Sequence, residues 1–152
     1  MLNRDYKEML QCFTEEGVEY LVVGAYAMAA HGYPRSTGDM DLWIRPTPEN
    51  AARVYRALAK FGAPLKDISP ADFQVQEMTF QIGVAPCRID VITSISGGIA
   101  FDQAAACAEK ADLGELEVPV LSRGDLIKNK IATGRPKDME DADLLRLPPS
   151  EE

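Results

Sequence analysis

The sequence has few of the residues that build the commonest redox and metal sites. Its three cysteines, Cys12, Cys87 and Cys107, are scattered and form no Cys-x-x-Cys pair. A disulfide framework or a zinc site is therefore not expected, and a reducing compartment such as the cytoplasm is. The single histidine, His31, excludes a histidine-rich metal centre, and any nucleophile–histidine–acid triad would have to use that residue.

Net positive charge and long apolar runs are also missing. The formal net charge is -8, which argues against a protein that coats long duplex DNA, because such a protein needs a basic face. No apolar run approaches the length that spans a membrane, and the charged, amphipathic N-terminus does not resemble a signal peptide. A small anionic ligand that is bound through metal ions remains compatible with this composition.

What is present predicts one folded domain over residues 1–152, with a loose tail at 148–152. Apolar residues make up 46% of the 152 residues, which is enough for a hydrophobic core. Hydrophobic periodicity and capping residues predict the secondary structure. We expect helices at 5–16, 25–31, 48–61, 101–111, 123–133 and 137–147, strands at 18–23, 40–44, 77–84, 88–95 and 115–121, and an irregular segment at 67–74. This order favours an α/β or α+β fold, in which helices flank a mixed sheet.

Two aspartates stand at the start of the second expected strand. Asp39 and Asp41 bracket Met40, so they point to the same face of a strand while Met40 and Leu42 point to the other. Adjacent carboxylates repel and raise each other's pKa unless a cation lies between them. Mg²⁺ prefers oxygen ligands, and one or two such ions can hold a phosphate during in-line displacement. Asp39 and Asp41 are therefore candidate metal ligands.

A third acid lies in the segment CRIDVIT. Asp90 shares one strand face with Arg88, and branched apolar residues flank it. Acids are rarely found in such a position without a partner. If this strand lies beside the strand that carries Asp39 and Asp41, the three carboxylates converge. Asp90 would then complete the metal site and could accept a proton from an attacking hydroxyl.

The segment before the first pair of acids predicts a phosphate site. An apolar strand is followed by Gly24 and Ala25 at the expected start of a helix, where the backbone can approach an anion and N–H groups are free. Arg35, Ser36 and Thr37 precede the acids and could hydrogen-bond to the same phosphates.

Each of these features also has a purely structural interpretation. An isolated Asp-x-Asp is more often a solvated turn, and Gly24 alone is more often a strand terminator. Asp90 could form a salt bridge with Arg88 or with a lysine, and His31 could be a helix-end residue that interacts favourably with the helix dipole. The order and spacing of the features together favour the functional interpretation.

The combination resembles the nucleotidyltransferase superfamily that is related to DNA polymerase β. That family has an apolar strand, Gly-Gly or Gly-Ser, a short helix, Asp-x-Asp and a third acid on a later strand. This chain has VVGAYAMAAHGYPRSTGDMDLWI and CRIDVIT. The segments RSTGDMD and LIKNKIATGRPKDMEDADLL resemble the small stand-alone bacterial members, including those of abortive-infection toxin systems. The resemblance covers about 18–145 and implies the nucleotidyltransferase fold. Ala25 departs from it, because the family has a second glycine or a serine there.

The resemblance also gives meaning to the late basic segment. It implies that Lys130 lies on a helix that faces the cleft and contacts phosphate. Arg135 and Asp138 match the Arg-Pro-Lys-Asp signature of the small members, and Asp138 would orient Lys130 or Arg135. A salt-bridge network that only fixes the last two helices explains the same residues equally well.

The expected activity is the Mg²⁺- or Mn²⁺-dependent transfer of a nucleoside monophosphate from an NTP to a hydroxyl, with release of pyrophosphate. The acceptor would be an RNA such as tRNA, a protein or a small molecule. A partner protein from a two-gene toxin–antitoxin system, a second copy or the 67–74 segment could recognise it. Two alternatives remain: a catalytically weak binding module that neutralises a protein partner, and a metal-dependent phosphohydrolase that uses the same acids.

Overall fold

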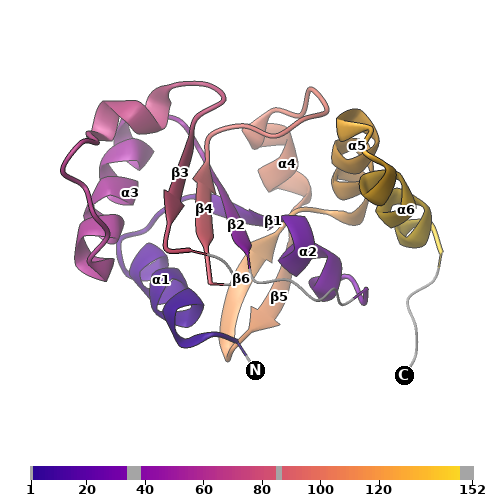
Figure 1. The fold of residues 1–152 in the computed structure, drawn as a ribbon, viewed down its shortest axis with the longest axis horizontal. Helices are drawn as coiled ribbons and strands as arrows, with labels where there is room; N and C mark the ends of the chain where they lie inside the picture. Colours follow the sequence, from indigo (N-terminus) through magenta and orange to yellow (C-terminus); the bar gives the residue numbers. More distant parts are fainter. Residues whose placement is uncertain (1, 34–38, 85–86, 148–152) are drawn as a thin grey trace.

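Helices surround a six-stranded sheet in the computed structural model, which describes residues 2–33, 39–84 and 87–147 (Figure 1). The strands are β1 (Tyr20–Val23), β2 (Met40–Ile44), β3 (Thr79–Ile82), β4 (Ile89–Ile92), β5 (Glu109–Leu113) and β6 (Leu116–Val120). The helices are α1 (Arg4–Glu15), α2 (Gly24–Ala30), α3 (Pro48–Phe61), α4 (Phe101–Cys107), α5 (Arg123–Thr133) and α6 (Pro136–Leu145), together with the 3-10 helix η1 (Pro70–Gln74). The predicted α/β architecture is confirmed.

The sheet is mixed, with the strand order β3-β4-β2-β1-β6-β5. β2 is antiparallel to β1 and parallel to β4, so its first residues lie beside the end of β1 and the start of β4. α1 and α3 lie to the left of these strands in Figure 1, and the α5–α6 pair lies to the right. The strands β1, β2 and β4 therefore form the middle of the sheet, where the acids were expected to meet.

Capping residues fix most of the helix ends where the sequence predicted them. Thr47 caps α3 by accepting a hydrogen bond from the backbone N–H of Asn50, and Pro48 occupies the first turn. Ser122 caps α5 in the same way, and Gly134 ends that helix in a left-handed conformation. The predicted helices over 48–61 and 123–133 are confirmed with these bounds.

The helix that was predicted over 101–111 is wrong in its second half. α4 ends at Cys107, and Glu109–Leu113 forms β5, which pairs with β6. The turn between β5 and β6 places both Gly114 and Glu115 at positive φ, 55° and 73°, as a two-residue hairpin turn requires. Pairing with β6 therefore overrides the helix propensity of the alanines, glutamate and lysine in this segment.

Other segments also differ from their expected extent. The segment 67–74, predicted to be irregular, contains η1, whose Phe73 is fully buried. The strands predicted at 18–23, 77–84 and 88–95 are shorter. The backbone N–H of Glu19, just before β1, donates a hydrogen bond to the side chain of Asn50. The hydroxyl of Thr93, just after β4, donates a hydrogen bond to the carbonyl oxygen of Val75. Both side chains satisfy backbone groups that strand pairing would otherwise use.

Alternation along β2 divides the core from the site. Met40, Leu42 and Ile44 are fully buried, as predicted for Met40 and Leu42. Trp43 points to the same face as Asp41, and its ring packs edge-on against Phe101 of α4. α4 therefore lies over the far end of this face. Among the described residues, no helix combines the length and the apolar character needed to cross a membrane.

Candidate functional site

The end of β1 brings Gly24 against the first strand of acids. Val23 is paired with Asp41, and Gly24 follows at φ +70° as the first residue of α2. A Cβ atom on Gly24 would overlap Oδ2 of Asp41 and lie 3.3 Å from its Cγ. Only glycine fits here, because the space of its missing side chain is filled by the Asp41 carboxylate and its φ is one that L side chains rarely adopt.

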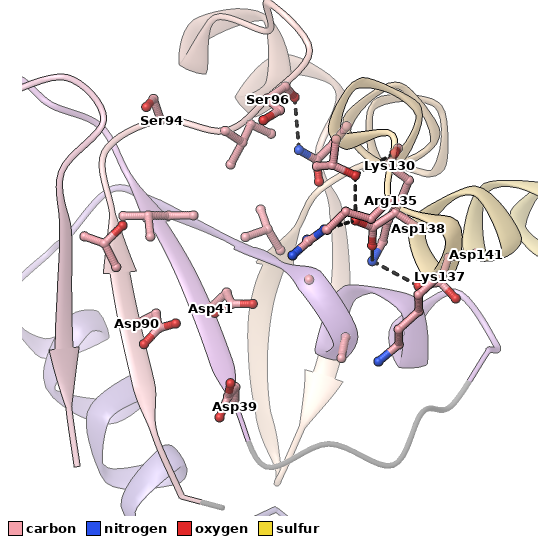
Figure 2. A pocket seen from close by; sticks show the side chains of 18 of the residues that line it. Asp39, Asp41, Asp90, Ser94, Ser96, Lys130, Arg135, Lys137, Asp138 and Asp141 are labelled. Carbon is pink, nitrogen blue, oxygen red and sulfur yellow. Dashed lines mark hydrogen bonds and ion pairs between the residues drawn. The ribbon is translucent and has the colours of Figure 1, made fainter. Parts of the chain in front are cut away.

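Asp41 and Asp90 lie side by side on neighbouring strands. β2 and β4 are parallel, and their register pairs Asp41 directly with Asp90. The condition for a shared site, that these strands be adjacent, is therefore met. Asp39 lies just before β2. Figure 2 shows the three carboxylates along one wall of the cavity.

Arg88 binds two of the three acids. Its Nε and Nη2 donate to the two oxygens of Asp90 at 2.9 and 3.2 Å, and Nη2 also donates to Oδ2 of Asp39 at 2.8 Å. The ion pair between Asp90 and Arg88, considered above as the structural interpretation of Asp90, is thus present. It does not displace Asp90 from the cavity, since Asp39, Asp90 and Arg88 all line it.

The electrostatics of the carboxylates are unfavourable without a further cation. Burial raises the pKa of Asp41 to about 7 from an ordinary 3.8, and the charges of Asp90 and Asp39 add to this effect. Arg88 opposes the rise without cancelling it. Asp41 is therefore partly protonated at neutral pH, a state that a positive ion beside it would reverse.

The carboxylates open into a cavity of about 580 Å³. Gly24 and Ala25 line it at the end of β1, and Ser94 and Ser96 line it after β4. The remaining wall comes from α5 and α6. Figure 2 shows Lys130, Arg135 and Lys137 on that wall, across the cavity from the three acids. A ligand in this cavity would lie between these cations on one side and the three carboxylates on the other.

Lys130 is held by two buried aspartates of α6. Its Nζ lies 3.3 Å from Oδ1 of Asp138 and 3.1 Å from Oδ2 of Asp141, and its side chain is only 12% exposed. Asp138 also accepts hydrogen bonds from Thr133 and from Nε of Arg135. Burial alone would raise the pKa of Asp138, but these two hydrogen bonds and the charge of Lys130 together lower it. The network joins α5 to α6, as the structural interpretation requires, and its residues also line the cavity.

Several site residues were not identified from the sequence. Asp141 lies three residues after Asp138 on α6, a spacing that places both on one helix face and could have signalled a shared partner. Arg88 was considered only as a partner of Asp90. Arg35, Ser36 and Thr37 lie outside the described residues. His31, at the end of α2, does not line the cavity. Nε2 of its ring lies 2.8 Å from the carbonyl oxygen of Leu121.

The donor set fits a hard divalent cation. Three carboxylates from β2, the residue before it and β4 are the ligand type that Mg²⁺ takes, and burial together with Asp90 and Asp39 raises the pKa of Asp41. In the described part of the chain, however, no group of three or more acidic, histidine or cysteine side chains is arranged around one metal position as the side chains stand. In this arrangement Arg88 binds oxygens of both Asp39 and Asp90.

The comparisons with known proteins place the fold. No protein-family model matches the chain, and no curated protein matches it in sequence. Among solved structures it is similar to a proposed nucleotidyltransferase from Thermotoga maritima, with a TM-score of 0.62 and 17% identity over 96% of this chain and 93% of that one. It is also similar to ANT(2″)-Ia in complex with adenylyl-2″-tobramycin, with a TM-score of 0.61 and 15% identity over 92% and 84% of the two chains. The lincosamide antibiotic adenylyltransferase LnuA, bound to lincomycin, gives a TM-score of 0.60 and 12% identity over 96% and 97%. The chain has the fold of these nucleotidyltransferases.

Proposed function

We propose that this protein is a Mg²⁺- or Mn²⁺-dependent nucleotidyltransferase that moves a nucleoside monophosphate from an NTP to a hydroxyl group. The observation that carries the proposal is the direct pairing of Asp41 with Asp90 on parallel strands, at the wall of a cavity whose opposite wall holds Lys130. The fold shared with solved nucleotidyltransferases supports it.

The residues of the cavity divide the work between them. Asp39, Asp41 and Asp90 would hold the metal, which when bound supplies positive charge to the reacting phosphate. The backbone at Gly24 and Ala25 would receive the triphosphate. Asp90 accepts the proton of the acceptor hydroxyl while the hydroxyl oxygen forms a bond to the α-phosphorus. The bond from that phosphorus to the bridging oxygen breaks, and pyrophosphate leaves with the electron pair.

The opposite wall completes the nucleotide site. Lys130 would contact the phosphates, while Asp138 orients it and also binds Arg135. Arg35, Ser36 and Thr37, which lie outside the described residues, remain candidates for further phosphate contacts.

The order of these elements across the sheet points to the position of the acceptor. The nucleotide's phosphates lie at the end of β1, the metal ligands on β2 and the base on β4. In-line displacement requires the attacking oxygen to come from the side opposite the leaving pyrophosphate, which here is the side of β4 and β3. A compartment of about 280 Å³ lies on that side, lined by Glu77, Thr79, Ser94, Ser96 and their neighbours. We place a small hydroxyl-bearing molecule there, ahead of RNA or protein.

Two neighbours by fold support a small acceptor, since their names refer to antibiotics. The cytoplasm, which supplies NTP and Mg²⁺, is the proposed location. A protein partner in a two-gene toxin–antitoxin system is the further context that the sequence resemblance suggests.

The test is label transfer from each of the four α-labelled NTPs with Mg²⁺, using tobramycin, lincomycin, total tRNA and a cell extract as acceptors. We expect labelled small-molecule product. Asp90→Asn should lower the rate by a factor of about 100 or more, the range for loss of a general base. The matched control is Asp112→Asn, which changes an exposed acid of the edge strand β5. Absence of transfer from every NTP to every acceptor would refute the proposal.

One observation favours a second candidate. Arg88 already binds Asp39 and Asp90, as would suit a catalytically weak module that neutralises a protein partner without turning over nucleotide. This candidate predicts no label transfer and no divalent-metal binding at the acids.

A further inference from the structure

The backbone of Arg88 is fixed from both sides. Its carbonyl oxygen accepts hydrogen bonds from the hydroxyl of Tyr6 at 3.1 Å and from the backbone N–H of Met40 at 3.0 Å. Tyr6 is a buried residue of α1, and Met40 begins β2. Any rearrangement at this position therefore has to come from the guanidinium group and its side chain.

The guanidinium holds its two carboxylates unequally. Asp90 receives two hydrogen bonds, one from Nε and one from Nη2, in the forked geometry that suits a carboxylate. Asp39 receives one, from the same Nη2. The Asp39 side chain is 35% exposed and that of Asp90 is 11% exposed. Compared with Asp90, Asp39 therefore has fewer hydrogen bonds to Arg88 and more access to water.

The charges show what the guanidinium replaces. Asp39, Asp41 and Asp90 together carry three negative charges when they are ionised, and Arg88 neutralises one of them. The oxygens that Arg88 occupies on Asp39 and Asp90 belong to the proposed metal ligands. A divalent ion and a guanidinium at these acids repel each other through their like charges, although an ionised carboxylate has about four lone-pair sites and can contact both.

We propose that Arg88 is an internal counter-ion that occupies the acids before metal binds, and that metal binding requires Arg88 to release Asp39 while it keeps Asp90. The inference rests on the proposed function, since it takes the same three acids as metal ligands. Arg88 then has two consequences. It weakens the binding of metal alone, and it orients Asp90, through the forked contact, once the metal is present.

The experiment measures the binding of Mn²⁺ alone, by the loss of the free-ion signal in electron paramagnetic resonance. Arg88→Gln removes the charge and keeps a hydrogen-bonding side chain. We expect it to lower the Mn²⁺ dissociation constant by on the order of tenfold or more, because one nearby positive charge is gone. The control is Arg56→Gln, which changes an exposed arginine that pairs with Glu16 and does not line the cavity; this variant should bind Mn²⁺ as the wild type does. An Arg88→Gln protein that binds Mn²⁺ equally or more weakly overturns the proposal.

A second measurement uses the wild-type protein, so it does not depend on the folding of a variant. Addition of Mg²⁺ should shift the side-chain Nε–H resonance of Arg88 in ¹⁵N NMR, and the resonance should persist because the contact with Asp90 remains. An unchanged resonance at saturating Mg²⁺ overturns the proposal. Neither measurement needs turnover. Tighter Mn²⁺ binding by Arg88→Gln in a protein that transfers no label would uphold this inference and refute the proposed function.

Discussion

Asp41 should destabilise the metal-free protein above neutral pH, and its replacement by asparagine should remove that cost. In the folded state burial, Asp90 and Asp39 raise the pKa of Asp41 from 3.8 to about 7. Between these two values the unfolded chain has released its proton and the folded chain has kept it. Raising the pH therefore favours the unfolded chain, and the free energy of unfolding falls until the folded carboxyl ionises as well, at about pH 7.

The magnitude follows from the interval between the two pKa values. At about 1.36 kcal/mol per pKa unit, an interval from 3.8 to about 7 corresponds to roughly 4 kcal/mol. Water and counter-ions at the mouth of the cavity screen part of this, so we expect about 2–4 kcal/mol. Asparagine has the shape of the protonated acid and can still donate a hydrogen bond to Asp90, so Asp41→Asn should not unfold the site.

The assay is urea denaturation of both proteins in EDTA at several values between about pH 5 and about pH 8. Titrating groups away from the site are common to both proteins, so the difference in their stabilities reports Asp41 and the carboxylates coupled to it. Asp41→Asn should be the more stable protein at high pH, and its advantage should shrink as the pH falls. Asp112→Asn, at an exposed position, serves as the control. Stabilities of Asp41→Asn and wild type that run parallel across the whole range would refute the reasoning.

Three further substitutions test other parts of the site and fold. Gly24→Ala should lower stability in thermal or urea unfolding more than Gly17→Ala, because both glycines have φ near +70° but only Gly24 lies against Asp41. The backbone strain that both variants share is about 1–2 kcal/mol. Equal losses of stability would show that the contact with Asp41 has no effect. Asp138→Asn should lower the free energy of unfolding by about 2–3 kcal/mol at neutral pH, and this loss should fade below about pH 4, because Asp138, whose pKa is lowered, stabilises the fold only while it is ionised. Asp143→Asn, in an exposed ion pair of the same helix, should lower it by at most about 0.5 kcal/mol. Similar losses in the two variants would contradict this prediction. Asn50→Ala should lower the free energy of unfolding, measured with urea, by about 2–4 kcal/mol, because the buried amide forms three hydrogen bonds with the backbone of Glu19 and Arg45. A loss below about 1 kcal/mol would mean that water replaces these hydrogen bonds.

Local patterns in the sequence predicted the faces of the strands well. The spacing of Asp39 and Asp41 around Met40 predicted the acidic and the buried sides of β2, and Met40 is indeed fully buried. Helix ends were also predictable at Thr47 and Ser122, because a cap bonds to a residue only three positions away. Such features depend on neighbours along the chain, and the sequence displays these neighbours directly.

Features that depend on distant partners were less accessible. The strand β5 was missed because Glu109–Leu113 has the composition of a helix, and only its pairing with β6 makes it extended. Asn50 reaches back 31 residues to Glu19, and no pattern in the sequence announces that contact. The sequence did not predict that Asp41 and Asp90 are adjacent, because parallel strands almost fifty residues apart in the chain need not be neighbours in the sheet. The role of Arg88 in binding both Asp39 and Asp90 follows only from that adjacency.

The acids of this one cavity differ in how their charge is compensated, and the difference bears on which of them await a ligand. Asp138 is buried, as Asp90 is, but Thr133, Arg135 and Lys130 contact it and its pKa is lowered. Asp41 is half-buried beside two carboxylates, and its pKa is raised. A purely structural network tends toward the first condition, because an uncompensated buried charge costs stability and other residues could replace it. The second condition holds at Asp41, beside a glycine whose missing side chain makes room for the carboxylate, and a cation supplied from solution would relieve it. For this reason we propose the acids of β2 and β4, rather than those of α6, as the metal ligands.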